Sequence, residues 1–484
     1  MAHRQRIRSP FTASLHTQAR HQDPSVLTLG APAIATNKMK PTEVIQLAKN
    51  HECRRLRLAY CDLTGAWRQR TLPISRLSEE LFQTGLMLAA GLRPEDSRAP
   101  RGRLRIVPDP ASARLGPLDN ADALTMLCHV RELQQDASHP CDARSIARRA
   151  QQFLQTSGVG DACHVGIASE FYLFNSVRYE NTSTASYFST QSPYEEAVQA
   201  TMDQPATPFG GQLGTHQAEC AGELCDAVMQ ALIVSGIDVF ATGPSEGPGQ
   251  SRIELGTSLL VESADRSLWL KRTVKHAARQ LRKTATFMPV PLQGEKASQL
   301  GVNLRISKQG ENIFFDSTSG KASDQATWFI NGLLQHAPAL CAFANASTNS
   351  YRRVLPPALQ GTDKRFAKDA SRSAFFAEAR SAEKDIHAPF ADASCNPYLT
   401  LSAMLLAGLD GILKQNKQPL PLPVPPLSLD EALTALAADH DFLLAGETFS
   451  KELIDRWIEQ KRSSEVRVVH QQPVPQEYQL YYDC

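Results

Sequence analysis

The sequence lacks a strong charge of either sign and a long hydrophobic run. Its 51 Lys and Arg residues nearly balance 50 Asp and Glu residues, which leaves a formal net charge of +1. This balance gives no electrostatic reason to expect nucleic acid or an anionic membrane surface as a partner. No apolar run reaches the roughly 18 residues that a membrane-spanning helix needs. We therefore expect partners other than nucleic acid and membranes.

The sequence also lacks paired metal-binding cysteines. It holds 10 cysteines, but they are scattered and none forms a Cys-x-x-Cys pair. We interpret them as reduced thiols of a cytoplasmic protein, in preference to a disulfide framework or a zinc site. There is no internal repeat and no Rossmann-type glycine motif, so the usual dinucleotide-binding sheet is not expected.

Composition agrees with a globular protein of enzyme size. The 484 residues are 42% hydrophobic and 21% charged, enough for a large core and two or three domains. Residues 1–38 differ from the rest: as far as His21 they hold Arg4, Arg6, Arg8 and Arg20 but no acid. We expect residues 1–38 to be a disordered extension, and an overextended gene start, a flexible arm and a transit peptide stay open as alternatives.

The remaining pattern indicates an α+β protein. Residues 55–61 alternate as a strand does, residues 62–65 supply a turn, and residues 67–72 are typical of the partner strand. They open a small N-terminal sheet domain, residues 39–137. From residue 138 to 484 the elements are longer, with helices expected at residues 143–157, 219–235, 265–283, 325–339 and 397–413.

Several segments resemble type I glutamine synthetases, from about residue 40 to the end. Residues 166–174 read Gly-Ile-Ala-Ser-Glu-Phe-Tyr-Leu-Phe, similar to the family's Gly-x-Glu-x-Glu-Phe-Phe-Leu-Phe strand. Further matches are Asn-Ser-Tyr-Arg-Arg at 349–353, Asn-Pro-Tyr at 396–398 and Leu-Tyr-Tyr-Asp at 480–483. The resemblance implies the glutamine synthetase fold, a small β-grasp-like N-terminal domain followed by a catalytic-type domain with a curved antiparallel sheet and flanking helices.

That family implies ATP-dependent ligation of glutamate and ammonia, with Mg²⁺ or Mn²⁺ neutralising phosphate charge. Its strand carries two acids, two residues apart and therefore on one face. Here Glu170 is present, but alanine occupies position 168, where the family has the other acid. The next matched acids fall on Pro244 or Ser245 and on Arg252, with Glu246 close by. An arginine about 4 Å from a divalent cation repels it by roughly 8 kcal/mol at an effective dielectric constant of 20.

Other family positions are also changed. Gly301 stands for the metal-binding histidine, His387 for the last metal-binding glutamate, and Leu359 for the glutamate that shields the acyl phosphate. Ala89 stands for an aspartate that the family donates to the neighbouring subunit's site. With an alternative gap, Glu254 takes the place of the acid lost at Arg252.

Some polar residues of the pocket persist. Glu170, Glu246, Arg252, Arg353 and Arg372 are expected to line a residual cleft, as an anion-binding group or as mutually neutralising ion pairs. Arg353 matches a substrate-side arginine, and Arg372 alone remains of three arginines in its segment.

Two functions follow as alternatives. One is a pseudoenzyme with an assembly, regulatory or ligand-binding role and no cofactor. The other is an ATP-dependent carboxylate-amine ligase with a rebuilt pocket, which needs ATP and Mg²⁺ or Mn²⁺. An ordinary active glutamine synthetase is a third reading. The expected partner is a second copy, as a homo-oligomer such as a dodecamer, or an active glutamine synthetase in a mixed ring.

Overall fold

A computed structural model describes residues 39–88, 104–116, 122–133, 138–182, 184–192, 215–316, 321–354, 378–380, 384–417, 424–475, 477 and 480. The expectation of a disordered extension at residues 1–38 lies outside these residues. The proposed boundaries at residues 38/39 and 137/138 stay predictions. No helix in the described part of the chain combines the length and the apolar character that crossing a membrane requires.

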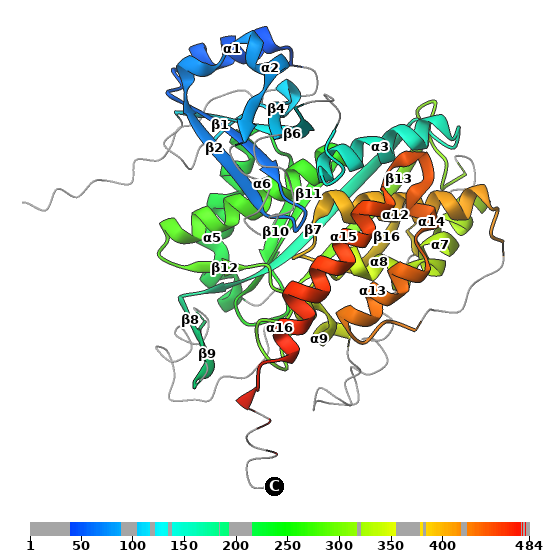
Figure 1. Cartoon of the computed structure of the whole chain (residues 1–484). Coiled ribbons are helices and arrows are strands. Elements are labelled where there is room, and N and C mark those ends of the chain that lie inside the picture. Colours follow the sequence, from blue (N-terminus) through cyan, green and yellow to red (C-terminus); the bar gives the residue numbers. More distant parts are fainter. Residues whose placement is uncertain are drawn as a thin grey trace, which may run out of the picture. The chain divides into compact units, whose positions relative to one another are not determined.

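The N-terminal residues form a sheet (Figure 1), and its strands follow the order β2-β1-β6-β4-β3. β1 (Arg55–Cys61) pairs antiparallel with β2 (Trp67–Pro73), as predicted, and parallel with β6 (Ala123–Glu132). The remaining elements of this region are α1 (Pro41–Asn50), η1 (Ile74–Arg76), α2 (Glu79–Thr84), β3 (Leu86–Leu88), β4 (Leu104–Pro108), η2 (Pro110–Ser112) and β5 (Arg114–Leu115).

The turn between β1 and β2 is fixed by its own side chains. Asp62 Oδ1 accepts hydrogen bonds from the backbone N–H of Thr64 at 3.0 Å and of Ala66 at 3.0 Å. Gly65 has a φ of 84°, which favours glycine, and a Cβ there would lie 3.0 Å from the Cα of Asn396. The hairpin tip therefore touches the start of a helix more than 300 residues later in the chain.

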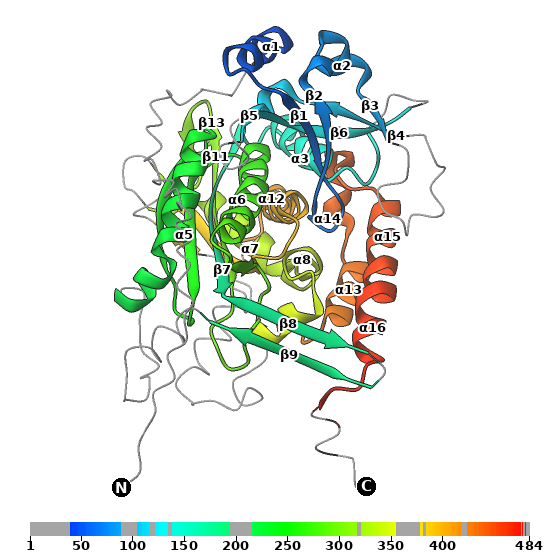
Figure 2. The ribbon, with the colours of Figure 1, turned by 90° about the vertical axis from the view of Figure 1, so that its left-hand side faces the viewer.

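The larger sheet is antiparallel throughout, in the order β10-β11-β7-β13-β16-β15. Its strands are β7 (Ala162–Phe174), β10 (Val239–Pro244), β11 (Gln250–Leu259), β13 (Gln299–Lys308), β15 (Glu378–Arg380) and β16 (Asp385–Asp392), with β12 (Thr284–Thr286) beside β7 and β14 (Glu311–Asn312) beside β13. β8 (Ser176–Asn181) and β9 (Ser186–Gln191) form a separate hairpin, seen lengthwise in Figure 2.

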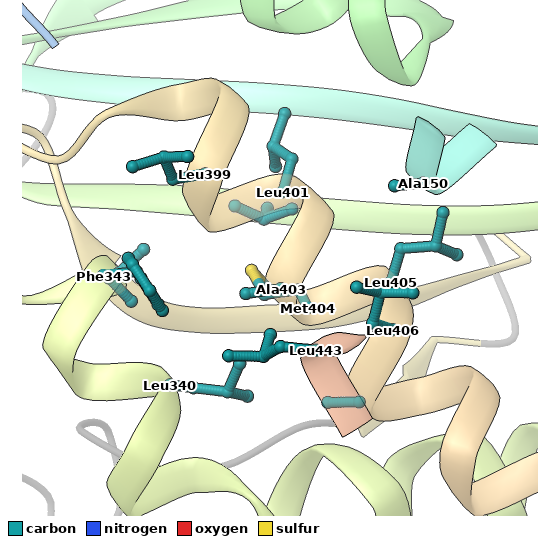
Figure 3. Packing of buried hydrophobic residues seen from close by; sticks show 14 of the residues in the cluster. Ala150, Leu340, Phe343, Leu399, Leu401, Ala403, Met404, Leu405, Leu406 and Leu443 are labelled. Atoms are coloured by element: carbon teal, nitrogen blue, oxygen red, sulfur yellow. The ribbon is translucent and has the colours of Figure 1, made fainter. Parts of the chain in front are cut away.

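Helices cover this sheet and surround α12 (Pro397–Leu413), which begins and ends where the sequence predicts. Fifteen of its 17 residues are buried, as expected for a helix that is apolar all round. Figure 3 shows Leu401 and Met404 of α12 among Leu340, Phe343, Leu443 and Ala150 from neighbouring helices. The other helices are α3 (Ala143–Thr156), α5 (Thr215–Val234), α6 (Leu260–Gln280), α7 (Asp324–Gln335), α8 (Ala337–Ala344), η4 (Thr348–Ser350), α9 (Tyr351–Val354), α13 (Leu429–Ala438), α14 (Asp441–Leu444), η5 (Ala445–Glu447), α15 (Lys451–Lys461), the π-helical η6 (Arg462–Val466) and α16 (Arg467–His470).

The single helix expected over residues 325–339 is wrong. The structure divides this segment at His336 into α7 and α8. Pro338 lies in the first turn of α8, where a missing N–H costs nothing, whereas in the interior of one continuous helix its ring would clash with the preceding turn.

A buried polar network joins the N-terminal sheet to the helices. Arg144 of α3 makes two hydrogen bonds to Asp265 of α6, at 2.9 and 2.8 Å, and an ion pair of 2.8 Å with Asp109. The Tyr398 hydroxyl donates to the same Asp265 at 2.5 Å, and Arg144 Nη1 donates to His129 of β6 at 2.7 Å. Burial would lower the pKa of Arg144, but Asp265 and Asp109 outweigh it and raise that pKa. The network therefore holds β6, α3, α6 and α12 together.

Candidate functional site

Sheet register brings together Ala168, Gly301 and His387, the positions at which the resemblance predicts metal ligands. On β7, Ala168 is paired with Gly301 of β13, and Asn303, two residues along β13, is paired with His387 of β16. A Cβ on Gly301 would lie 3.6 Å from the Cβ of Ala168 and 3.8 Å from Cε1 of His387. The three residues line one small region, but Ala168 and Gly301 supply no donor atom there.

His387 is held by a neighbouring amide. Its Nδ1 lies 2.7 Å from Oδ1 of Asn303, and because a carbonyl oxygen only accepts, the imidazole donates from Nδ1. His387 is buried in the sheet. Asn303 thus orients the ring by a hydrogen bond within the protein.

Glu170 lies two residues along β7 and is buried, with three groups around its carboxylate. Oε1 accepts from the hydroxyl of Ser245 at 3.0 Å, and Oε2 accepts from the backbone N–H of Gln299 at 2.9 Å. Nη1 of Arg252 is 3.7 Å from Oε1. Burial raises the pKa of Glu170, although all three neighbours favour the carboxylate.

Arg252 lies between two carboxylates. It is paired with Glu170 across β11 and β7, while Glu254 is paired with Ala168. Residues two apart on a strand share a face, and Nε of Arg252 donates to Oε1 of Glu254 at 2.8 Å. Ala168 therefore has the carboxylate of Glu254 beside it on the next strand, but that carboxylate is paired with Arg252.

Of the other predicted pocket residues, the structure describes Glu246 and Arg353. Glu246 forms an ion pair of 2.9 Å with Lys296, whose charge also favours the carboxylate of Glu170. Arg353 donates from Nη2 to Oδ1 of Asn345 at 2.9 Å and to the carbonyl of Phe390 at 2.5 Å. Its buried Nε makes no hydrogen bond within the described residues, and burial lowers its pKa. Ala89, Leu359 and Arg372 lie outside the described residues.

Sequence reasoning assigned too small a part to Glu254 and missed two contacts of Glu170. The alternation of Arg252 and Glu254 on one strand was a signal for their ion pair. Ser245 was already matched to the position of a family acid, but the sequence did not predict that its hydroxyl binds Glu170. The N–H of Gln299 belongs to the backbone, so no residue type could have indicated it.

The donor set does not fit a pair of divalent cations. Such ions bind carboxylate oxygens and imidazole nitrogens. In the described part of the chain, no three His, Cys, Asp or Glu side chains gather closely enough to hold a metal ion. The guanidinium of Arg252 instead lies on the carboxylates that face this region.

Comparison with known proteins identifies the relatives of the chain. A model of the glutamine synthetase catalytic domain matches residues 140–481. The glutamine synthetase of Frankia alni is 31% identical over 477 residues, covering 92% of this chain and 99% of the relative. That of Neisseria gonorrhoeae is 33% identical over 475 residues, covering 92% and 100%.

Solved structures agree on the fold. The Plasmodium falciparum glutamine synthetase has a TM-score of 0.81 at 20% identity, covering 92% of this chain and 99% of that one. A GmaS complex with ADP has a TM-score of 0.73 at 20% identity, covering 92% and 100%.

Proposed function

The chain belongs to the glutamine synthetase family, and from this premise we propose that it is a non-catalytic member, a pseudoenzyme with an assembly, regulatory or ligand-binding role. The observation that carries the proposal is the position of Arg252. Its guanidinium is 3.7 Å from Glu170 and 2.8 Å from Glu254. A fixed positive charge thus stands at the position where the resemblance predicts a metal-binding acid. Repulsion between this charge and a divalent cation opposes metal binding.

A ligase with a rebuilt pocket is the alternative. New acid and amine substrates would account for changes at Lys296 and Ala297, where the resemblance places glutamate-binding groups. They would not account for Ala168, Gly301 and Arg252, because every ATP-dependent member needs metals on the phosphates. The pseudoenzyme therefore explains more of the changed positions.

Calorimetric titration with ATP and Mg²⁺ or Mn²⁺ tests the proposal directly. We expect binding weaker than millimolar, with neither phosphate release nor γ-glutamyl hydroxamate above background. The Neisseria gonorrhoeae relative under the same conditions is the positive control. Turnover of glutamate and ammonia at about 1 to 1000 per second, the usual range of enzymes, would refute the pseudoenzyme.

A repair experiment tests how many parts are missing. Arg252→Glu alone is expected to give no synthetase activity, because Ala168, Gly301 and Leu359 each remove a different part of a set that acts as a unit. Glutamine formation by that single variant would show that one substitution, and not the whole set, had switched off the enzyme.

We also propose assembly, either as a dodecamer or in a mixed ring with an active glutamine synthetase. Support comes from the retained packing segments, such as Asn396 and Tyr398 at the start of α12. In a mixed ring the chain is expected to lower its partner's activity, because Ala89 replaces the donated aspartate. The buried thiols fit a cytoplasmic location. Light scattering followed by co-expression tests the assembly, and a monomer of 53.1 kDa that leaves the partner's activity unchanged would contradict it.

A further inference from the structure

Arg252 differs from the other cations around Glu170 in forming ion pairs with both Glu170 and Glu254. Its Nη1 is 3.7 Å from Glu170 and its Nε is 2.8 Å from Glu254. Lys296 lies beside Glu246 at 2.9 Å, and Arg353 donates to an amide oxygen and a backbone carbonyl. Arg252 is thus the described cation that connects the acid of β7 with the acid of β11.

The two acids have unequal access to water. The side chain of Glu170 is 6% exposed, while those of Arg252 and Glu254 are 31% and 35% exposed. A buried carboxylate without a counter-charge is strongly destabilising, whereas a partly exposed one is solvated. Glu170 therefore depends on a nearby cation more than Glu254 does.

We infer that Arg252 is a resident cation, a side chain that takes over the charge-balancing role of a divalent ion and closes a latent divalent-cation site formed by Glu170 and Glu254. The inference rests on the proposed function, since it explains how the pocket stays stable without the family's metals. A guanidinium is always charged and presents several donors in a rigid plane, so it can satisfy carboxylates on two strands at once.

Removal of Arg252 should let a divalent ion take the place of the guanidinium. Without it, Glu170 and Glu254 keep their carboxylates on one face, with the hydroxyl of Ser245 at 3.0 Å from Glu170. Oxygen donors of this kind suit hard divalent cations, with water completing the coordination. The variant is then expected to bind an ion that the wild-type chain excludes.

The test is Arg252→Ala with Mn²⁺ as the probe. In EDTA the variant should melt at a lower temperature than wild type, and millimolar Mn²⁺ should raise its Tm by about 2 °C or more, because an ion that binds only the folded state stabilises it. The wild-type Tm should not respond. Paramagnetic resonance of bound Mn²⁺ should count one ion per chain in the variant and none in wild type.

Two controls isolate the carboxylate bridge. Arg305→Ala removes an arginine of the same sheet, which pairs with Asp385 at 2.7 Å, and its Tm should not respond to Mn²⁺. Arg252→Ala combined with Glu254→Gln should lose the Mn²⁺ response. If Arg252→Ala fails to fold, Arg252→Gln replaces it, since its amide fills more of the same space.

The outcomes separate this inference from the proposed function. A folded Arg252→Ala or Arg252→Gln without Mn²⁺ binding overturns the resident cation even if the wild-type chain is inactive. Mn²⁺ binding by wild type as strong as by the variant also overturns it. Catalytic turnover by the wild-type chain would overturn the pseudoenzyme first, and the Mn²⁺ count would still report on Arg252.

Discussion

The buried junction of Arg144 and the cluster around Glu170 are both polar, but they are built differently. At the junction, Arg144, Asp265 and Tyr398 are buried and their contacts measure 2.5–2.9 Å. In the Glu170 cluster, Arg252 lies 3.7 Å from the carboxylate, and the neighbouring Ala168 and Gly301 offer no polar side chain. The groups that hold the fold and the groups at the positions where the resemblance predicts chemistry therefore form two separate clusters.

The largest expected effect comes from breaking the junction. Arg144→Ala leaves the buried Asp265 and the partly buried Asp109 without their cation, which should lower the free energy of unfolding by about 3–5 kcal/mol. Urea denaturation followed by circular dichroism, at a fixed protein concentration, measures the change.

The matched control is Arg148→Ala, one turn further along α3. Arg148 is exposed and also contacts Nε2 of His129, at 3.2 Å. Its loss should cost less than about 1 kcal/mol. Equal effects of the two variants would show that the junction does not depend on the buried ion pairs of Arg144.

Replacing one glycine in each region compares how tightly the two regions are packed. A Cβ at Gly411 of α12 would lie 2.1 Å from the carbonyl oxygen of Trp328 on α7, so Gly411→Ala must push these helices apart. We expect a loss of about 1–3 kcal/mol from overpacking, despite a gain of about 1 kcal/mol in helix propensity.

Near Glu170, Gly301→Ala places its Cβ at ordinary contact distances of 3.6 and 3.8 Å. Its effect should stay within about 0.5 kcal/mol. Thermal melts of both variants provide the measurement, and a severe effect of Gly301→Ala would mean that the surroundings of Gly301 are packed as tightly as the α7–α12 contact.

A pH-dependent effect, smaller than that of Arg144→Ala, is expected from a histidine at the α7–α8 break. Nδ1 of His336 is 2.8 Å from Asp439, and Nε2 is 3.0 Å from Asp410, which also pairs with Lys414 at 2.9 Å. Burial opposes the charge, but the two hydrogen bonds outweigh it and raise the pKa of His336. Its contribution is then complete below its unfolded pKa of about 6.5 and is lost as the pH rises through the raised folded value.

Asp410 acts at the other end of the pH range. Despite burial, the hydrogen bond from His336 lowers the pKa of Asp410, so its contribution fades as the pH falls through that lowered value. Wild type should lose stability between pH 5.5 and pH 9 as His336 loses its charge. The His336→Gln variant should lose about 1 kcal/mol less over the same range, a figure discounted for the exposure of Asp439.

The control for this cluster is His440→Gln. The ring of His440 contacts the backbone carbonyls of Leu436 and Ala437, not a carboxylate. Melts at both pH values should leave its pH dependence as in wild type. If His336→Gln kept the full pH dependence, the cluster would not be its source.

Local signals predicted the helix at residues 397–413 and the hairpin from Arg55 to Leu72 because apolar periodicity and turn residues fix such elements. The break at His336 was missed, although Pro338 was a readable signal for it. The family resemblance supplied the antiparallel sheet, which no local pattern specifies.

The site was predictable as a set of positions but not as a set of contacts. Ala168, Gly301 and His387 were marked as related, and the register places them together. The ion pair of Arg252 with Glu254 required knowing which strand lies beside β7. Pairing between distant strands depends on the whole sheet, so single residues could not reveal it.

The buried thiols can report which part of this protein opens first. The eight cysteines whose side chains the structure describes are buried and free of disulfide bonds. Burial raises the pKa of Cys163 to about 12 and that of Cys395 to about 11, so at neutral pH neither presents a thiolate to a labelling reagent. Cys53 and Cys128 lie in the core of the N-terminal sheet, while Cys163 and Cys341 lie in the main core. The order in which these sulfurs become alkylated therefore records which layer of the molecule opens first.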